Sequence, residues 1–253
     1  MAKPVSNHTD VKILQRHKVD WDELASLDPM WAVLSEPDKR GNQWNSDAFF
    51  HTGKGEIDRL MSKLARLTQA RRKALDFGCG LGRLTRALLA YYGEAHGVDI
   101  SANMVNQAKL LAPSCSFHVN ESDDLSLFPD KTFDLVYSNR VLQHLPSSAM
   151  IANFIREFFR ITVPGGLVVF QVPCKKSYRN IFNVKRSAFR FLRAVGVRPD
   201  TVYSRLKLHP MRMTALPKRD VRAVVRESSG ELLDESLDES AHFAVLYCCR
   251  RVD

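Results

Sequence analysis

The chain has 253 residues, a formal net charge of +9 and 45% hydrophobic residues. This length and composition suffice to bury the core of one large domain with added segments. The absence of any run of 18 or more apolar residues argues against a membrane-spanning helix, and no apolar signal-peptide centre follows the first Met. Five cysteines without C-x-x-C spacing favour a reduced, cytoplasmic protein.

Residues 1–70 are predicted to form a helical N-terminal extension. A short helix is expected to begin near Asp20, and Ser46 is expected to cap a second short helix over residues 47–51. Apolar residues at helical spacing then predict a longer helix over residues 54–67.

Residues 71–253 are predicted to form one α/β domain. Runs of period-2 and continuous apolar residues predict strands at 73–77, 95–99, 116–119, 132–138 and 166–172. Helical periodicity predicts helices at 83–91, 102–111, 148–161 and 218–228. Because strands and helices alternate, the sheet is expected to be parallel and covered on both faces.

A glycine-rich turn follows the first predicted strand. Gly78, Gly80 and Gly82 are spaced G-x-G-x-G, and glycine lets a ligand approach the main chain. A dinucleotide fingerprint places its third glycine where Arg83 stands, so the turn departs from that motif. Asp99 ends the next apolar run 21 residues after Gly78, the spacing expected of a carboxylate that binds ribose hydroxyls.

Three later segments, together with this turn and acid, resemble the class I S-adenosylmethionine (SAM)-dependent methyltransferases. They are an acidic loop leading into Pro-Asp-Lys-Thr-Phe-Asp-Leu-Val, the segment 139–146, and a Pro-Gly-Gly turn leading into Leu-Val-Val-Phe. The motifs occur in the family's order across residues 73–172. The resemblance implies a doubly wound, mostly parallel seven-stranded sheet with a C-terminal antiparallel hairpin at 231–238 and 241–250.

The resemblance also implies a SAM site of the small-molecule type. Gly78 and Gly80 would admit the methionine portion, Asp99 would accept bonds from the ribose, and an acid within residues 121–124 would meet the adenine. A surface ion pair is the alternative role for Arg83. The predicted cofactor-binding residues are Asp76, Gly78, Gly80, Arg83, Asp99, Ile100, Met104, Ser122, Asp123 and Ser138.

His144 is the candidate catalytic residue. In this family the segment after the fourth strand borders the transferred methyl group, and an imidazole is suited to accept a proton from a hydroxyl or ammonium acceptor. A structural role is the alternative. The other histidines show no metal-ligand spacing, so no metal is expected.

The basic character of the chain is concentrated in residues 174–226, which hold fifteen Lys or Arg and two acids. Within this stretch, residues 174–213 are expected to be a lid-like insertion. Its amphipathic part, 177–196, allows three readings: a lid over the substrate, a contact with a membrane surface or anionic partner, or a nucleic-acid contact. The lid is favoured, with an apolar stripe that includes Val184, Ala188 and Val195 facing inward.

The predicted function is SAM-dependent methyl transfer to oxygen or nitrogen of a small-molecule or lipid-linked acceptor. The alternatives are an RNA or protein methyltransferase guided by the basic segment, and a non-catalytic SAM-binding or membrane-docking module. Trp44, Phe49 and Phe50 are expected either to cover the cofactor or to pack in the core. The chain is expected to be a monomer or a homodimer.

Overall fold

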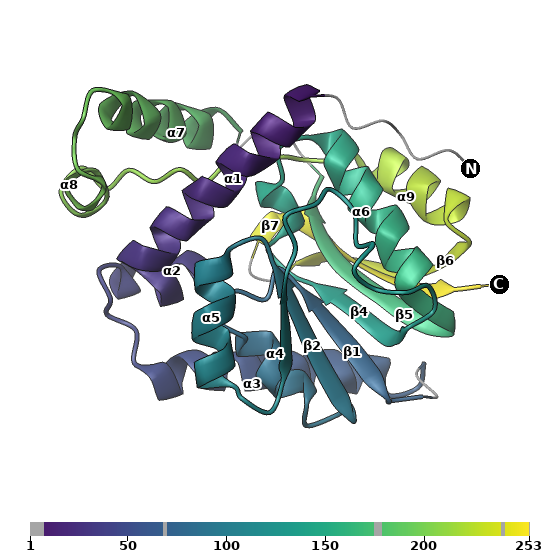
Figure 1. Ribbon diagram of the computed structural model, residues 1–253. Helices are drawn as coiled ribbons and strands as arrows, with labels where there is room; N and C mark the ends of the chain where they lie inside the picture. The colour runs from purple at the N-terminus through teal and green to yellow at the C-terminus, as the bar shows by residue number, and fades with distance from the viewer. Residues whose placement is uncertain (1–7, 68–69, 175–178, 239–240, 253) are drawn as a thin grey trace.

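The structure, a computed structural model, describes residues 8–67, 70–174, 179–238 and 241–252. They form one seven-stranded sheet of order β3-β2-β1-β4-β5-β7-β6, with helices on both faces (Figure 1). The strands are β1 (Lys73–Phe77), β2 (Glu94–Asp99), β3 (Ser116–Val119), β4 (Phe133–Ser138), β5 (Thr162–Pro173), β6 (Gly230–Asp238) and β7 (Ala241–Arg251). The predicted fold class is confirmed.

Strand pairing creates a topological switch point in the middle of the sheet, between β1 and β4. β1 pairs in parallel with β2 on one side and with β4 on the other, so the chain order reverses between β1 and β4. β7 then pairs antiparallel with both β5 and β6, forming the predicted C-terminal hairpin. In open α/β sheets, ligands bind beyond the carboxyl ends of the strands at such a switch point.

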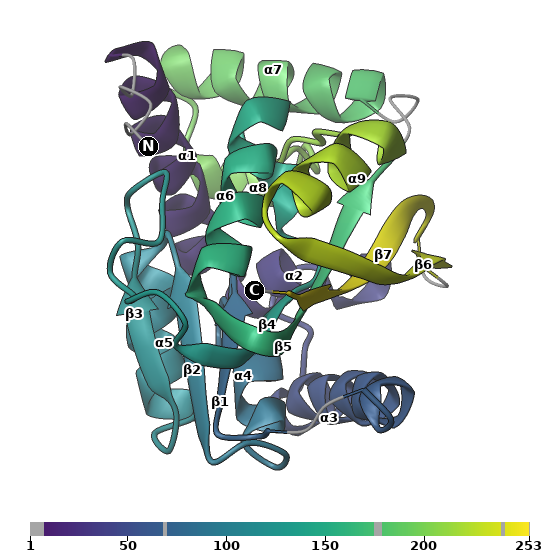
Figure 2. The ribbon, with the colours of Figure 1, turned by 90° about the vertical axis from the view of Figure 1, so that its right-hand side faces the viewer.

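Two helical layers cover the sheet (Figure 2). Apolar residues of α3 and α4 pack against one face, whereas those of α6 and α9 pack against the other. The helices are α1 (His8–Leu27), α2 (Pro29–Val33), α3 (Ser46–Leu64), α4 (Arg83–Leu88), α5 (Ala102–Leu111), α6 (Ser148–Ile161), α7 (Arg179–Ala194), α8 (Pro199–Ser204) and α9 (Lys218–Glu227), with 3-10 turns at Pro37–Lys39 and Leu142–His144.

The N-terminal helix is longer than predicted. α1 begins at His8 instead of near Asp20, because no glycine or proline interrupts the chain until Pro29. Asp20 is not a cap. It lies inside α1, where its carboxylate forms an ion pair with Arg186 of α7. α1 and α7 thus lie side by side above the carboxyl ends of the parallel strands (Figures 1 and 2).

The two helices predicted over residues 47–51 and 54–67 are one helix, α3. Asn45, and not Ser46, caps it by accepting a hydrogen bond from the Ala48 amide at 3.1 Å. The helix passes through Gly53 without a break because the turn is packed tightly. A Cβ at Gly53 would lie 2.7 Å from Cγ of Arg83, so glycine here lets α3 approach α4 closely.

The insertion after β5 is helical but presents a different face from the one predicted. In α7 the Phe189 side chain is buried at 2% exposure, whereas Val184 is 69% exposed, and Val195, directly after the helix, is 59% exposed. The predicted inward stripe is therefore wrong at those two positions. Polar contacts orient the helix: Arg186 pairs with Asp20 and Arg193 with Glu23, and in this orientation Val184 and Val195 face solvent.

Candidate functional site

A cavity of about 710 Å³ lies at the switch point. Its floor comes from the ends of β1, β2 and β4, and its roof from α1, α2 and residues 207–213. This volume is within the range of roughly 300–1,000 Å³ that is typical of small-molecule sites. Among the predicted site residues, those that line it are Gly78, Gly80, Arg83, Asp99, Ile100, Met104, Ser122 and His144.

The glycine turn forms a cradle that side chains would fill. Gly78, Gly80 and Gly82 have φ angles of 77°, 51° and 79°, in the region that favours glycine. The amides of Gly78 and Cys79 donate to the Val98 carbonyl at 2.8 and 3.1 Å, which ties the turn to β2. A Cβ at Gly78 would lie 2.8 Å from Cβ of Val141, so only a bare main chain fits.

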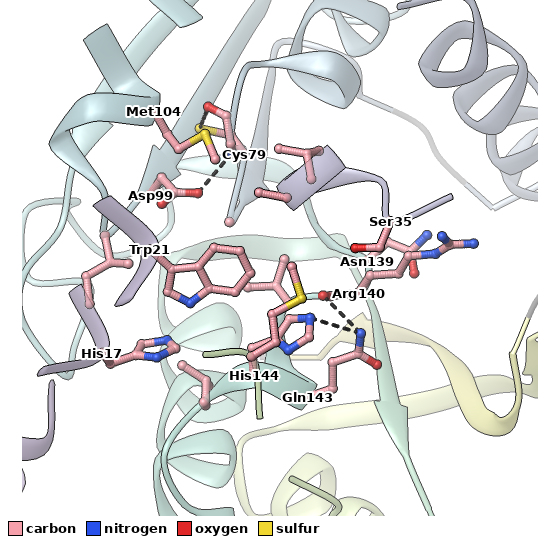
Figure 3. Close-up of a pocket in the computed structure, with 18 of the residues that line it drawn as sticks. His17, Trp21, Ser35, Cys79, Asp99, Met104, Asn139, Arg140, Gln143 and His144 are labelled. Carbon is pink, nitrogen blue, oxygen red and sulfur yellow. Dashed lines mark hydrogen bonds between the residues drawn. The ribbon is translucent and has the colours of Figure 1, made fainter. Parts of the chain in front are cut away.

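Asp99 lies beside this cradle at the end of β2 (Figure 3). Its Oδ2 accepts a hydrogen bond from the Gly80 amide at 2.9 Å, and its Oδ1 accepts one from the Ser101 amide at 2.9 Å. Burial raises the pKa of this carboxyl, and the amide bonds oppose that effect. A carboxylate has about four acceptor sites, so Asp99 retains capacity to accept a hydrogen bond from a ligand hydroxyl.

Ile100 and Met104 contribute apolar side chains to the wall, and Ser122 also lines the cavity. The acids of the following loop are not among the described residues lining the cavity. The predicted binding residue Asp123 is one of these acids that do not line the cavity. Glu121 instead pairs with Lys18 at 3.2 Å, and Oδ1 of Asp124 accepts a hydrogen bond from the Ser126 hydroxyl at 2.8 Å. Which group reads an adenine therefore stays a prediction.

Asn120, directly before the acidic loop, lines the cavity. Its amide nitrogen donates to the carbonyls of Ser122 and Asp124 at 3.3 and 2.8 Å, so it shapes the loop. The sequence could have indicated Asn120 as a lining residue because it directly follows β3, and ligands bind beyond the carboxyl ends of parallel strands.

Asp76 and Ser138 lie beneath the cavity and do not line it. Oδ2 of Asp76 accepts from the Thr85 hydroxyl at 2.7 Å, which fixes α4 to β1, and burial raises the pKa of this carboxyl to about 7. The Ser138 hydroxyl donates to the Phe77 carbonyl at 3.3 Å. Both residues support the turn from below.

Arg83 is held by a half-buried acid, Glu56, that the sequence did not single out. Its guanidinium donates to Glu56 at 2.9 Å, and the same carboxylate accepts from Tyr137 at 2.9 Å and Asn139 at 2.7 Å. These bonds lower the pKa of Glu56 although burial, the largest single effect, raises it. The network joins α3, α4 and β4 at one side of the cavity.

His144 lies in the opposite wall, with its ring against that of Trp21 at a centroid distance of 5.3 Å (Figure 3). Nδ1 is 2.8 Å from the Arg212 carbonyl and must donate to it, whereas Nε2 is 3.2 Å from Nε2 of Gln143 and accepts from it. Burial lowers the pKa of His144 to about 4. The imidazole is therefore neutral at pH 7, and both of its nitrogens are engaged.

The N-terminal aromatics take two different roles. Phe49 and Phe50 are buried in a cluster with Leu81, and the Trp44 indole donates to the Leu34 carbonyl at 3.0 Å, so these three pack in the core. Trp21 and Trp31 line the cavity instead.

The described residues contain no group of three or more metal-binding side chains. Among these same residues, no helix is long and apolar enough to cross a membrane.

Residues 75–170 match a protein-family model described as a methyltransferase domain. Together with the sheet order and the cradle beside Asp99, this match identifies residues 75–170 as a methyltransferase domain. The chain carries a class I SAM-dependent methyltransferase domain. The recognition and cofactor predictions are thereby confirmed.

Two curated methyltransferases illustrate the similarity. The chain is 33% identical over 130 residues to a trans-aconitate 2-methyltransferase of Methylobacterium radiotolerans, covering 51% of this chain and 45% of that protein. It is 36% identical over 117 residues to a malonyl-[acyl-carrier protein] O-methyltransferase of Halorhodospira halophila, covering 45% of this chain and 39% of that protein. The similar region thus spans less than half the length of either relative.

Solved structures share the methyltransferase fold at low identity. A SAM-dependent methyltransferase of Leishmania major superposes with a TM-score of 0.63 at 16% identity, covering 94% of this chain and 82% of that one. Magnesium protoporphyrin IX methyltransferase of Synechocystis, solved with bound S-adenosylhomocysteine (SAH), gives a TM-score of 0.54 at 15% identity and covers 80% and 85%.

Proposed function

We propose that the protein transfers the methyl group of SAM to an oxygen or nitrogen of a small-molecule acceptor. The observation that carries this proposal is the single cavity that joins the bare main chain at Gly78 and Gly80, the carboxylate of Asp99 and a roofed apolar compartment. The relatives support it, because their names describe transfer to trans-aconitate and to malonyl-[acyl-carrier protein].

The residues present fit the cofactor. The space above the glycines is closed to a Cβ by Val141 and Val33, but it is open to a ligand from the cavity side. Asp99 would hold the ribose, Ile100 and Met104 would flank the adenine, and Arg83 would face the methionine carboxylate. When bound, SAM supplies a methyl group made electrophilic by a sulfonium.

The protein's contribution is to position the acceptor and to exclude water. Trp21 and Trp31 roof the cavity from α1 and α2, next to the floor formed by the glycine turn. Orientation of two reactants in one site can lower a barrier by roughly 7–11 kcal/mol. A roof that orients the acceptor and excludes water would therefore supply part of the rate enhancement.

We propose that His144 is a positioning residue and not a general base. A base must carry a free lone pair and a pKa near the working pH, whereas Nε2 of His144 accepts from Gln143 and burial lowers the pKa of the ring to about 4. Its ring instead holds Trp21 over the cavity. A His144→Gln variant should lose activity by the same factor from pH 6 to pH 9, because no titrating group is removed.

The basic segment gives little support to an RNA or protein acceptor. Several of its cations have acidic partners within the chain, including Arg186 with Asp20 and Arg222 with Glu235. The exposed face of α7 carries apolar side chains, with Phe191 67% exposed. Peripheral contact with a membrane through this face stays a prediction.

Calorimetry with SAH tests the proposal. We expect SAH to bind the wild-type protein and Asp99→Asn to bind it at least about tenfold more weakly, because a charge-assisted pair of hydrogen bonds is lost. Asp47→Asn, an exposed change in the first turn of α3, is the matched control and should bind SAH like the wild type. Unchanged affinity in Asp99→Asn, or no binding by the wild type, would contradict the assignment.

A further inference from the structure

The cavity wall has a marked imbalance of charge. Asp99 is the only carboxylate among the described residues that line it, and it lies at the cofactor end. The cationic side chains in the same wall are Arg40, Arg83, Arg140, Lys185 and Lys207. Glu56 balances Arg83, whereas Arg40, Lys185 and Lys207 form no ion pair with an acid among the described residues.

Arg40, Lys185 and Lys207 form a cationic rim around the acceptor end of the cavity. The Arg40 guanidinium donates to the carbonyls of Tyr203, Lys207 and Leu208, and it forms no ion pair among the described residues. Lys185 and Lys207 are exposed where the cavity meets solvent, and neither pairs with an acid in the described part of the chain. A rim of like charge attracts an anion into a low-dielectric cavity.

Two buried histidines, His17 and His209, and the half-buried His144 line the same cavity near these cations. Burial lowers the pKa of His17 to about 3 and those of His144 and His209 to about 4. Neighbouring cations add to the effect: Arg212 acts on His17 and His144, while Arg40 and Lys185 act on His209. All three rings are therefore neutral at pH 7.

Among the described residues that line the acceptor end, none is suited to accept a proton at pH 7. A hydroxyl acceptor needs a base to take its proton. The histidines in this wall are poor bases, and Asp99 lies at the cofactor end. A carboxylate, whose acid has an ordinary pKa of about 4, is already deprotonated at pH 7 and needs no base.

We propose that the acceptor is a carboxylate drawn in by the cationic rim, and that the product is its methyl ester. This inference rests on the proposed function and names the substrate class of the same cavity. As the carboxylate oxygen bonds the methyl carbon, the carbon–sulfur bond breaks and its electron pair stays on sulfur. The products are an uncharged ester and a thioether, and no proton moves.

Binding measurements on the SAH-loaded protein test the rim. The probes are citrate and succinate, with uncharged succinamide and inorganic phosphate for comparison. We expect the two carboxylates to bind at least about tenfold more tightly than succinamide. The double variant Lys185→Gln/Lys207→Asn should weaken carboxylate binding about tenfold; asparagine suits the φ of 55° at position 207.

The matched control is Lys109→Gln, which removes one charge from an exposed position on α5 outside the cavity wall. It should bind the carboxylates like the wild type. Equal binding of succinate and succinamide, phosphate binding without carboxylate binding, or an unaffected double variant would overturn the proposal. SAH binding is measured first in every variant, so its loss, which bears on the proposed function, is distinguished from loss of carboxylate binding.

The product gives a second, independent test. The enzyme is incubated with methyl-labelled SAM and an extract of small molecules from its source organism, and the labelled products are treated with mild alkali. Methyl esters release volatile labelled methanol, whereas methyl ethers and N-methyl groups are stable. Release of most of the label is expected; label that stays bound after alkali would overturn the proposal while leaving the methyltransferase function in place.

Discussion

At the scale of single residues, the cavity depends on positions where no side chain fits. Gly80 has a φ of 51°, and a Cβ there would collide with the side chain of Val33 on α2. Gly165 has a φ of 76° but has nothing within 4 Å of an added Cβ. A side chain at Gly165 would therefore meet backbone strain alone, whereas a side chain at Gly80 would meet both strain and a steric clash.

We therefore expect Gly80→Ala to weaken SAH binding more than about tenfold and to lower stability by roughly 1–3 kcal/mol, because strain and overpacking add. Gly165→Ala should show strain alone, about 1–2 kcal/mol, with unchanged SAH affinity. Calorimetry and denaturant unfolding measure both. Equal SAH affinities in the two variants would show that the cradle does not contact the ligand.

Asp76 predicts a pH dependence of stability. Its carboxyl has a pKa raised to about 7 in the folded protein, against about 3.9 in the unfolded chain. Between these values the native state binds the additional proton, so this group makes the wild type less stable as pH rises from 4 to 7. The Asp76→Asn variant has no titrating carboxyl at this position, so it lacks this pH dependence of stability.

The stability of Asp76→Asn relative to wild type should accordingly increase from pH 4 to pH 7, by an amount on the order of 3 kcal/mol or less. Denaturant unfolding at several pH values measures this difference and cancels the titration of the other acids. A difference that is constant over this range would show that Asp76 is ionised in the folded protein.

At the scale of elements, the sequence predicted the central βαβ units well and the added helices poorly. Period and turn signals are local, so α5 and α6 begin and end where the pattern placed them. The predicted starts of the N-terminal helices were wrong because Ser, Asp and Asn all cap helices, and the sequence does not show which of them does so. Asp20 lies inside α1, and Asn45 caps α3. Tight packing against Arg83, which no local pattern shows, keeps Gly53 helical.

Docking of α7 on α1 provides a prediction at this scale. The Arg186–Asp20 pair is 14% and 13% exposed at 3.3 Å, and Arg190 and Arg212 also act on this one carboxylate. Asp20→Asn would leave several cations near one another without their acid. We expect a loss of stability of about 2 kcal/mol and faster amide hydrogen exchange in residues 184–194.

Asp200→Asn, which breaks the exposed Arg198–Asp200 pair at 3.4 Å, is the control and should change stability by less than about 0.5 kcal/mol. If Asp20→Asn gives the same exchange rates in α7 as this control, the ion pair does not hold the roof.

At the scale of the whole molecule, the reversal of strand order between β1 and β4 determines where the ligand can bind. The motif order predicted the floor of the cavity, including Gly78, Gly80 and Asp99. The roof could not be predicted, because contacts such as Trp21 with His144 join distant parts of the chain. The role of Glu56 could not be predicted for the same reason, because its hydrogen-bond partners are on β4, α4 and the segment after β4.

The most direct test of the central claim is a crystal structure of the protein with SAH. The predicted result is an adenosyl group in the cavity, with its ribose hydroxyls about 2.6–3.2 Å from the carboxylate of Asp99 and its amino-acid portion over Gly78 and Gly80. A cavity that stays empty at saturating SAH, or SAH bound with its ribose away from Asp99, would contradict the account.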